Sequence, residues 1–104
     1  MSRYTLRPKA EEDLLQHEEY LAENASVETA GWFLDAVERS LRLLATQPEM
    51  GAQRAYRRPE LEGQRMWPIR GFENYLAFYF PTDYGVDVTR VLYATRDIKR
   101  IFQE

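Results

Sequence analysis

The feature that most constrains the fold is an apolar stripe along residues 27–44. Ser26 is a suitable N-cap for a helix there, Glu28 lies in its first turn, and Pro48 and Gly51 end the pattern. The apolar residues recur every three or four positions and therefore share one helix face. They are Val27, Ala30, Phe33, Leu34, Val37, Leu41 and Leu44. Such a face needs a second apolar layer to pack against.

An earlier helix is predicted before this one. Residues 3–7 (RYTLR) alternate as in a short strand, and Pro8 then suits the first turn of a helix. The predicted buried face of that helix consists of Ala10, Leu14, His17 and Leu21. Residues 23–26 (ENAS) leave only a short loop between the two helices, so we expect an antiparallel helical hairpin.

Three strand candidates occupy the second half of the chain. Residues 50–63 follow neither the helix period nor the strand period, and we interpret them as a polar connecting segment. The candidate at residues 64–69 is the weakest, because Pro68 suits a strand end or an edge strand. Residues 74–80 (NYLAFYF) are strong strand formers. The charged, amphipathic residues 96–102 predict a short helix at the C-terminal end.

The third candidate, residues 86–94, changes its pattern part of the way along. Val86 and Val88 alternate as in a half-buried strand, but the apolar positions from Val91 onward are out of step with them. One extra residue in the strand would reconcile the two halves. We therefore predict a β-bulge near Arg90.

These elements predict an α+β fold in the order β-α-α-β-β-β. The strand and the two-helix hairpin would pack on a small, mostly antiparallel sheet. Within the aromatic strand, Leu76, Phe78 and Phe80 are expected to face the helices, because side chains alternate along a strand. Tyr75 and Tyr79 are then expected on the opposite face, where a partner would cover them.

Length and composition exclude several classes of protein. At 104 residues the chain is one domain with a modest core. It has no cysteine, no apolar segment typical of a signal peptide and no run long enough to span a membrane, so we expect a cytoplasmic protein. The net charge of −3 argues against nonspecific nucleic-acid binding by the whole surface, although residues 51–70 hold five arginines against two glutamates.

Four segments resemble the RelE/ParE toxin superfamily, in the right order and over nearly the whole chain. YTLRPKAEEDLLQHEEYL (4–21) resembles its first strand and helix, and AGWFLDAVERSLRLLATQPEMG (30–51) its second helix. GFENYLAFYF (71–80) and VTRVLYATRD (88–97) are similar to its last two strands. The resemblance implies the toxin of a bacterial type II toxin–antitoxin pair, with a cognate antitoxin as partner.

The two branches of this superfamily imply different chemistry. ParE-like members bind and poison DNA gyrase, and RelE-like members cut messenger RNA, usually on the ribosome. RelE-like ribonucleases have a lysine-rich middle and a histidine near the C-terminus. This chain departs from both features, because its two lysines (Lys9 and Lys99) lie near the chain ends and no histidine lies near the C-terminus. We therefore favour the hypothesis of a ParE-like function. A third hypothesis is an interaction module that has kept the fold and lost toxicity, because the net acidity of this chain is less usual for the family.

Candidate residues differ between the two branches. A ribonuclease would use Tyr93 as proton donor or base, with Arg65 and Arg96 at the scissile phosphate. Arg70 and Arg90 would add positive charge. This chemistry requires that the cations lower the tyrosine pKa from its usual value of about 10. His17 is interpreted as a partly buried, hydrogen-bonded side chain. The candidates for gyrase binding are exposed aromatic and basic residues, namely Arg65, Arg70, Tyr93, Arg96, Lys99 and Arg100.

Antitoxin binding points to a different group of residues. Trp32 lies opposite the core side of its helix, near Leu43, and an exposed tryptophan is typical of a partner site. The alternative for Trp32 is packing against the first helix or against the loop in the 50s. Tyr75 and Tyr79 complete the predicted antitoxin surface. No spacing of histidines or carboxylates indicates a metal site, and no motif indicates a cofactor.

Overall fold

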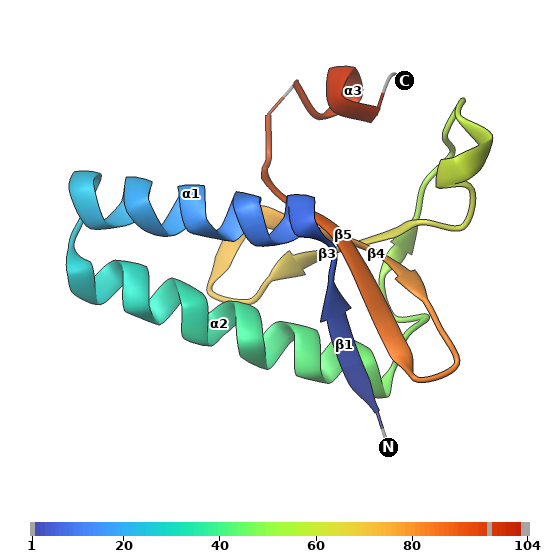
Figure 1. The fold of residues 1–104 in the computed structure, drawn as a ribbon, viewed down its shortest axis with the longest axis horizontal. Helices are drawn as coiled ribbons and strands as arrows, with labels where there is room; N and C mark the ends of the chain where they lie inside the picture. Colours follow the sequence, from blue (N-terminus) through green and yellow to red (C-terminus); the bar gives the residue numbers. More distant parts are fainter. Residues whose placement is uncertain (1, 96, 103–104) are drawn as a thin grey trace.

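The computed structural model describes residues 2–95 and 97–102, and it confirms the predicted α+β fold (Figure 1). Its elements are β1 (Arg3–Leu6), α1 (Pro8–Asn24), α2 (Val27–Thr46), β2 (Ala52–Gln53), the 3-10 helix η1 (Pro59–Leu61), β3 (Arg65–Ile69), β4 (Phe72–Pro81), β5 (Gly85–Tyr93) and α3 (Asp97–Phe102). α1 and α2 run antiparallel beside the sheet, and α3 stands apart from them (Figure 1). No helix among the described residues has the length and apolar character needed to cross a bilayer.

The five strands form one sheet in the order β1-β5-β4-β3-β2. β1 pairs in parallel with β5, and the other neighbours are antiparallel. The prediction that residues 50–63 only connect was wrong in part, because Ala52 and Gln53 pair with Met66 and Arg65 at the sheet edge. Two residues are too few to show a strand period, so the sequence carried no signal for β2.

The predicted bulge in β5 is confirmed. Tyr79 pairs with Val88 and Phe78 with Arg90, so Thr89 is the extra residue between them. The bulge lets Val88 and Val91 both point into the same core, although they are three residues apart. The buried Thr89 hydroxyl then donates to the Phe78 carbonyl or the Gln64 side chain, at 3.0 and 2.6 Å.

The helical hairpin covers one face of the sheet and forms the larger core with it. Ser26 caps α2, because its hydroxyl accepts a hydrogen bond from the Thr29 amide, as its sequence position predicted. The fully buried side chains at the centre of this core come from α2, β3, β4 and β5. They include Phe33, Leu41, Leu44, Ile69, Tyr79, Val86, Val88 and Val91.

The predicted faces of β4 were reversed. Tyr75 and Tyr79 belong to the core under the helices and are 7% and 0% exposed. Phe78 lies on the opposite face, where it packs with Leu92 and with Ile98 and Phe102 of α3. Both faces of β4 are apolar, so alternation alone could not assign them. The Tyr79 hydroxyl can be buried because it donates to the Pro48 carbonyl and accepts from the Gly51 amide.

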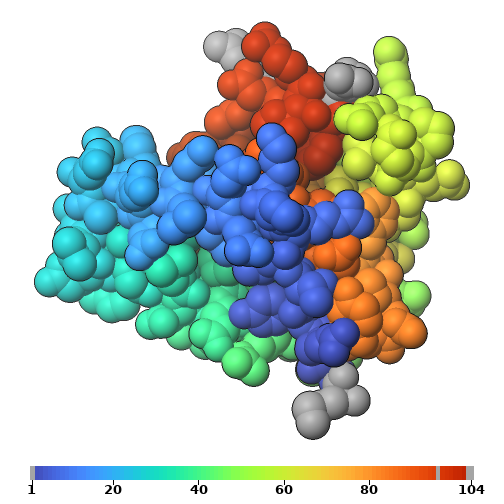
Figure 2. All heavy atoms as spheres, viewed as in Figure 1, coloured from blue at the N-terminus to red at the C-terminus, as the bar shows by residue number. Residues whose placement is uncertain are grey.

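α3 therefore covers the second face of the sheet. The Phe102 ring packs against Phe78, with ring centroids 4.8 Å apart, and against Tyr56 of the 50–63 segment at 5.6 Å. Figure 2 shows α3 and this segment in contact along one side of the molecule. The sheet is thus enclosed by the hairpin on one face and by α3 with the 50–63 segment on the other.

Candidate functional site

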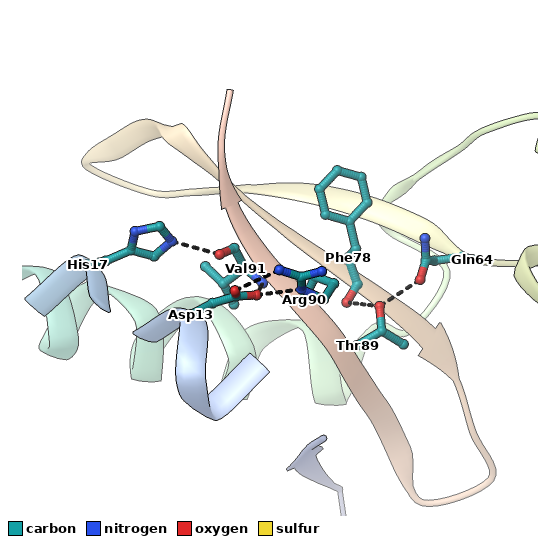
Figure 3. A network of polar contacts seen from close by, with 7 residues as sticks. All are labelled: Asp13, His17, Gln64, Phe78, Thr89, Arg90 and Val91. Carbon is teal, nitrogen blue, oxygen red and sulfur yellow. Dashed lines mark hydrogen bonds and ion pairs between the residues drawn. The ribbon is translucent and has the colours of Figure 1, made fainter. Parts of the chain in front are cut away.

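An ion pair joins α1 to β5 beside the bulge (Figure 3). The Asp13 carboxylate accepts two hydrogen bonds from the Arg90 guanidinium, at 2.8 and 2.9 Å, and a third from the Val91 amide at 3.0 Å. Asp13 is only 6% exposed, and its hydrogen bonds raise the pKa of the Arg90 guanidinium. Arg90 is therefore engaged in the structure and does not present free charge near Tyr93.

His17 continues the same connection one helical turn later. Its Nε2 donates to the Val91 carbonyl at 2.7 Å, since a carbonyl can only accept (Figure 3). The ring also packs edge-on against Tyr75, with centroids 4.9 Å apart. The interpretation of His17 as a partly buried, hydrogen-bonded residue is confirmed. Among the described residues, no three His, Cys, Asp or Glu side chains come together in a way that would hold a metal ion.

Arg65 is also engaged within the fold. Its guanidinium Nη1 donates to the carbonyls of Glu49 and Gly51, at 3.0 and 2.7 Å, and thereby holds the loop that follows α2. In the sheet, Arg65 lies opposite Tyr79. These contacts give Arg65 a clear role in positioning the loop. The sequence predicts Arg65 as a catalytic or target-binding cation, and the structure shows its guanidinium bound to these two carbonyls.

The predicted ribonuclease residues are not brought together. Tyr93 lies opposite Tyr75 and Arg65 lies opposite Tyr79, so the two are offset by four residues of β4, or roughly 13 Å along the strand. Arg96, the third residue of this set, lies outside the described residues. The described part of the chain therefore does not place Arg65 or Arg90 where it would assist proton transfer by Tyr93.

Two buried tyrosines also lack the activation that such chemistry needs. Burial raises the pKa of the Tyr75 phenol, and the neighbouring Tyr93 and Tyr20 raise it further. Burial likewise raises the pKa of the Tyr79 phenol, although the Gly51 amide and Arg65 act in the opposite direction. A catalytic tyrosine would require a lowered pKa. These two phenols are structural.

The remaining cations predicted for target binding lie on the surface. Lys99 and Arg100 are exposed on α3, whose opposite side packs on the sheet through Ile98 and Phe102. Arg70 is exposed at the end of β3, and its amide donates to the Ser40 hydroxyl of α2 at 3.1 Å. Tyr93 is 47% exposed at the end of β5. These residues are accessible to a partner.

A groove of about 850 Å³ runs between α2 and β3, and we call it the α2–β3 groove. Leu43 and Arg39 of α2 line it on one side, and Trp67, Pro68 and Arg70 on the other. β2 pairs only with the first two residues of β3, and no other described strand covers the outer edge from Trp67 onward. The groove therefore combines an apolar floor with an uncovered strand edge.

Trp32 lies on the helix side that leads into this groove. It precedes Arg39 by seven residues and Leu43 by eleven, spacings that place all three on one stripe of α2. Trp32 is 62% exposed and Leu43 is 36% exposed. The exposed position predicted for Trp32 is thus confirmed. The exposed, partner-facing position predicted for Tyr75 and Tyr79 is wrong, because the helices cover both rings.

Sequence reasoning missed the role of Asp13. Asp13 follows Glu11 and Glu12 near the start of α1, where acidic side chains suit the positive end of the helix dipole, so its residue type alone does not single it out. A signal was present, because Asp13 follows Ala10 by three residues and precedes His17 by four, on the buried stripe of the helix. A carboxylate on such a stripe requires a cationic partner. Arg90 is distant in sequence, and only the fold shows it to be that partner.

Comparisons with known proteins agree with this architecture. A family model described as "ParE toxin of type II toxin-antitoxin system, parDE" matches residues 4–98. A solved structure titled "Chromosomal ParDE TA system from P. aeruginosa" is similar in fold, with a TM-score of 0.72 and 17% sequence identity over 91% of this chain and 98% of that chain. No curated protein matches the sequence.

Proposed function

Because the chain belongs to the ParE toxin family of type II toxin–antitoxin systems, we propose that it arrests bacterial growth by binding DNA gyrase in the cytoplasm. A cognate antitoxin would hold it inactive. The match to the family model over residues 4–98 is the observation that carries this proposal. The match covers both long helices, every strand apart from the first residue of β1, and the first two residues of α3.

The state of the polar residues supports action by binding. A ribonuclease needs a proton donor, a base and free cations at one place. Here Arg65 and Arg90 are bound to other groups of the fold, and Tyr93 lies away from Arg65. Exposed basic side chains at Lys99, Arg100 and Arg70 suit recognition of an acidic protein surface.

We place the antitoxin on the α2–β3 groove and the adjoining stripe of α2. An extended segment would pair with the uncovered edge of β3, or a helix would lie along α2, and either mode would bury Trp32 and Leu43. Exposed apolar surface beside a free strand edge is the kind of surface that a permanent partner covers. In this proposal Trp32 is a binding anchor, and its contribution to folding is small.

Two experiments test the gyrase proposal. The protein is first expressed from an inducible promoter in a bacterium, and colony-forming units are counted after induction. The purified protein is then added to gyrase in a supercoiling assay, with total cellular RNA from the induced culture analysed in parallel. We expect growth arrest, loss of supercoiling and intact messenger RNA. Normal growth would overturn the toxin proposal and favour a module that has lost toxicity.

The same experiments distinguish the ribonuclease function. Growth arrest with cleaved messenger RNA and active gyrase would overturn the gyrase proposal. In that case Tyr93→Phe, which keeps the exposed ring and removes the hydroxyl, should abolish cleavage. If the protein poisons gyrase, Tyr93→Phe should arrest growth as well as the unaltered chain does.

A further inference from the structure

A second groove, of about 890 Å³, lies between the C-terminal half of α1 and the adjoining ends of β4 and β5. We call it the tyrosine groove. Its walls include Tyr20 and Gln16 of α1, Tyr93 of β5 and Glu73 of β4, and the buried Tyr75 lies at its base. The proposed function makes no use of it beyond the position of Tyr93.

Aromatic rings dominate this groove. Tyr20 is 60% exposed and Tyr93 is 47% exposed, while Tyr75 is almost fully buried between them and the core. The Tyr75 and Tyr93 rings meet edge to face, with centroids 5.0 Å apart. Exposed rings of this size are costly to leave in water. The edge-to-face arrangement leaves part of the Tyr93 ring accessible from the groove.

The charge of the groove is negative. Glu73 is the carboxylate among its lining residues, and Glu18, Glu19 and Glu23 lie on the same half of α1 as the groove. No described lysine or arginine is among the lining residues. His17 is the only lining histidine, and its Nε2 is occupied by the Val91 carbonyl. Glu73 uses Oε2 to accept the Gly71 amide at 2.8 Å, which positions the carboxylate at the turn between β3 and β4.

We propose that the tyrosine groove binds an arginine side chain presented by a protein partner. A guanidinium can stack on the faces of Tyr20 and Tyr93 and pair with the planar Glu73 carboxylate. Lysine would pair with the carboxylate but would stack less well, because its ammonium is a compact and strongly hydrated charge. A nucleic acid would be repelled by the same carboxylates.

The volume of the groove indicates that the arginine enters as part of a peptide segment. A single arginine side chain occupies only a fraction of about 890 Å³. The apolar surface of Leu21 and Phe72 beside the rings suits flanking apolar residues of the same segment. A suitable probe is therefore a short peptide with a central arginine between two leucines.

The test is a titration of the ¹⁵N-labelled full chain with the acetylated and amidated peptide Ala-Leu-Arg-Leu-Ala, followed by amide chemical shifts. The control peptide carries citrulline at the centre, which keeps the shape of arginine and removes its charge. We expect saturable shifts confined to Gln16, Gly71, Asn74 and their neighbours. The citrulline peptide should bind about tenfold or more weakly, because it lacks the charge that both the rings and the carboxylate attract.

Variants of exposed residues identify the contacts without endangering the fold. Tyr93→Phe should bind the arginine peptide nearly as well as the unaltered chain, and Tyr93→Leu about threefold or more weakly, since only the latter removes the ring. Glu73→Gln should also weaken binding, while its amide oxygen can still accept the Gly71 amide. Glu62→Gln, an exposed change of the same kind outside the groove, should bind normally.

Four results would overturn the proposal. They are the absence of saturable shifts, shifts spread over the whole acidic surface of α1, equal binding of the citrulline peptide, and equal binding by Tyr93→Leu. A lysine peptide that binds as tightly as the arginine peptide would overturn the stacking role of the tyrosines. None of these measurements depends on gyrase or on growth arrest, so failure here is distinguishable from failure of the proposed function.

Discussion

Asp13 and Arg90, which lie 77 positions apart in the chain, form a two-point ion pair that joins the first helix to the last strand. The Asp13 carboxylate also accepts the Val91 amide, next to the bulge at Thr89. One carboxylate thus holds a side chain and the backbone of β5 at the place where the strand changes register. The side chain of Arg90 remains 23% exposed, against 8% for Asp13.

Removing the charge of Asp13 should destabilise the protein substantially. We expect Asp13→Asn to lower the free energy of unfolding by about 3 kcal/mol, because the substitution leaves the Arg90 guanidinium without its partner in a partly buried site. Urea denaturation followed by circular dichroism measures this change. The control is Glu19→Gln, an exposed change on the same helix, which should stay within about 0.5 kcal/mol.

A double-mutant cycle tests whether this loss belongs to the pair. Arg90→Gln alone should also destabilise the fold, and the double variant should lose at least about 1 kcal/mol less than the sum of the two single losses. Strict additivity of the three values would contradict the assignment of Asp13 and Arg90 as energetically coupled partners.

Tyr79 should make the fold sensitive to alkaline pH. Its pKa is raised in the folded state, so above about pH 10 the unfolded chain releases the phenol proton more readily than the folded chain does. Folding stability should therefore be complete below that pH and fall as pH rises. Melting temperatures of the unaltered chain and of Tyr79→Phe between about pH 8 and 11 measure the effect.

The phenylalanine variant should show two opposite changes. At neutral pH it should be less stable by about 1–2 kcal/mol, because the Pro48 carbonyl and the Gly51 amide lose their partner. At alkaline pH its stability should fall less steeply than that of the unaltered chain. Parallel curves of stability against pH for the two proteins would contradict a raised pKa of Tyr79 in the folded state. Tyr20→Phe controls for loss of an exposed hydroxyl at neutral pH.

Trp32 and Leu43 should matter for antitoxin binding and hardly at all for folding. Because both side chains are exposed, Trp32→Ala and Leu43→Ala should each change the free energy of unfolding by less than about 1 kcal/mol. Trp32→Ala should weaken binding of the cognate antitoxin at least tenfold, as expected for a tryptophan anchor. Isothermal titration calorimetry measures the affinity.

Val27 offers a matched control for this prediction. It is 75% exposed on the first turn of the same helix and does not line the α2–β3 groove. Val27→Ala should bind the antitoxin as well as the unaltered chain does. Equal affinity of Trp32→Ala and Val27→Ala would show that the antitoxin docks elsewhere.

Lys99 and Arg100 should contribute to toxicity through α3. Their side chains are exposed, while Ile98 and Phe102 of the same helix pack on the sheet. The double change Lys99→Ala with Arg100→Ala should leave the melting temperature nearly unchanged and reduce gyrase inhibition at least tenfold, because electrostatic contacts to an acidic surface are lost. A supercoiling assay over a range of protein concentrations measures the inhibition.

Arg57→Ala removes an exposed cation of the loop before η1 and serves as the charge control. It should inhibit gyrase normally. If Arg57→Ala and the α3 double variant lost activity equally, the effect would come from the overall charge, and α3 would have no specific role.

The sequence by itself determined the features that depend on local periodicity. Both long helices, the Ser26 cap, the three main strands and the bulge beside Arg90 follow from spacings of two, three or four residues within one segment. The exposed position of Trp32 follows in the same way, because it lies opposite the apolar stripe of its own helix. Four sequence segments, taken in this order, resembled the toxin superfamily.

Only the tertiary structure decided which of two apolar faces lies under the helices. Within residues 74–80 of β4, both alternating sets contain two aromatic residues, so hydrophobicity could not rank the two faces, and we placed the tyrosines outside. The decisive contacts come from elsewhere in the chain. The Pro48 carbonyl and the Gly51 amide satisfy the Tyr79 hydroxyl in the core, and a side chain at Gly51 would collide with that hydroxyl.

The same reason applies to the charged residues. Arg65 and Arg90 looked like free cations in the sequence, and the fold supplies each with partners, two carbonyls for Arg65 and the Asp13 carboxylate for Arg90. Periodicity reports how a residue is placed within its own element. Whether a charge is free or paired depends on residues that the topology brings to it, and for Arg90 that residue lies at the other end of the chain.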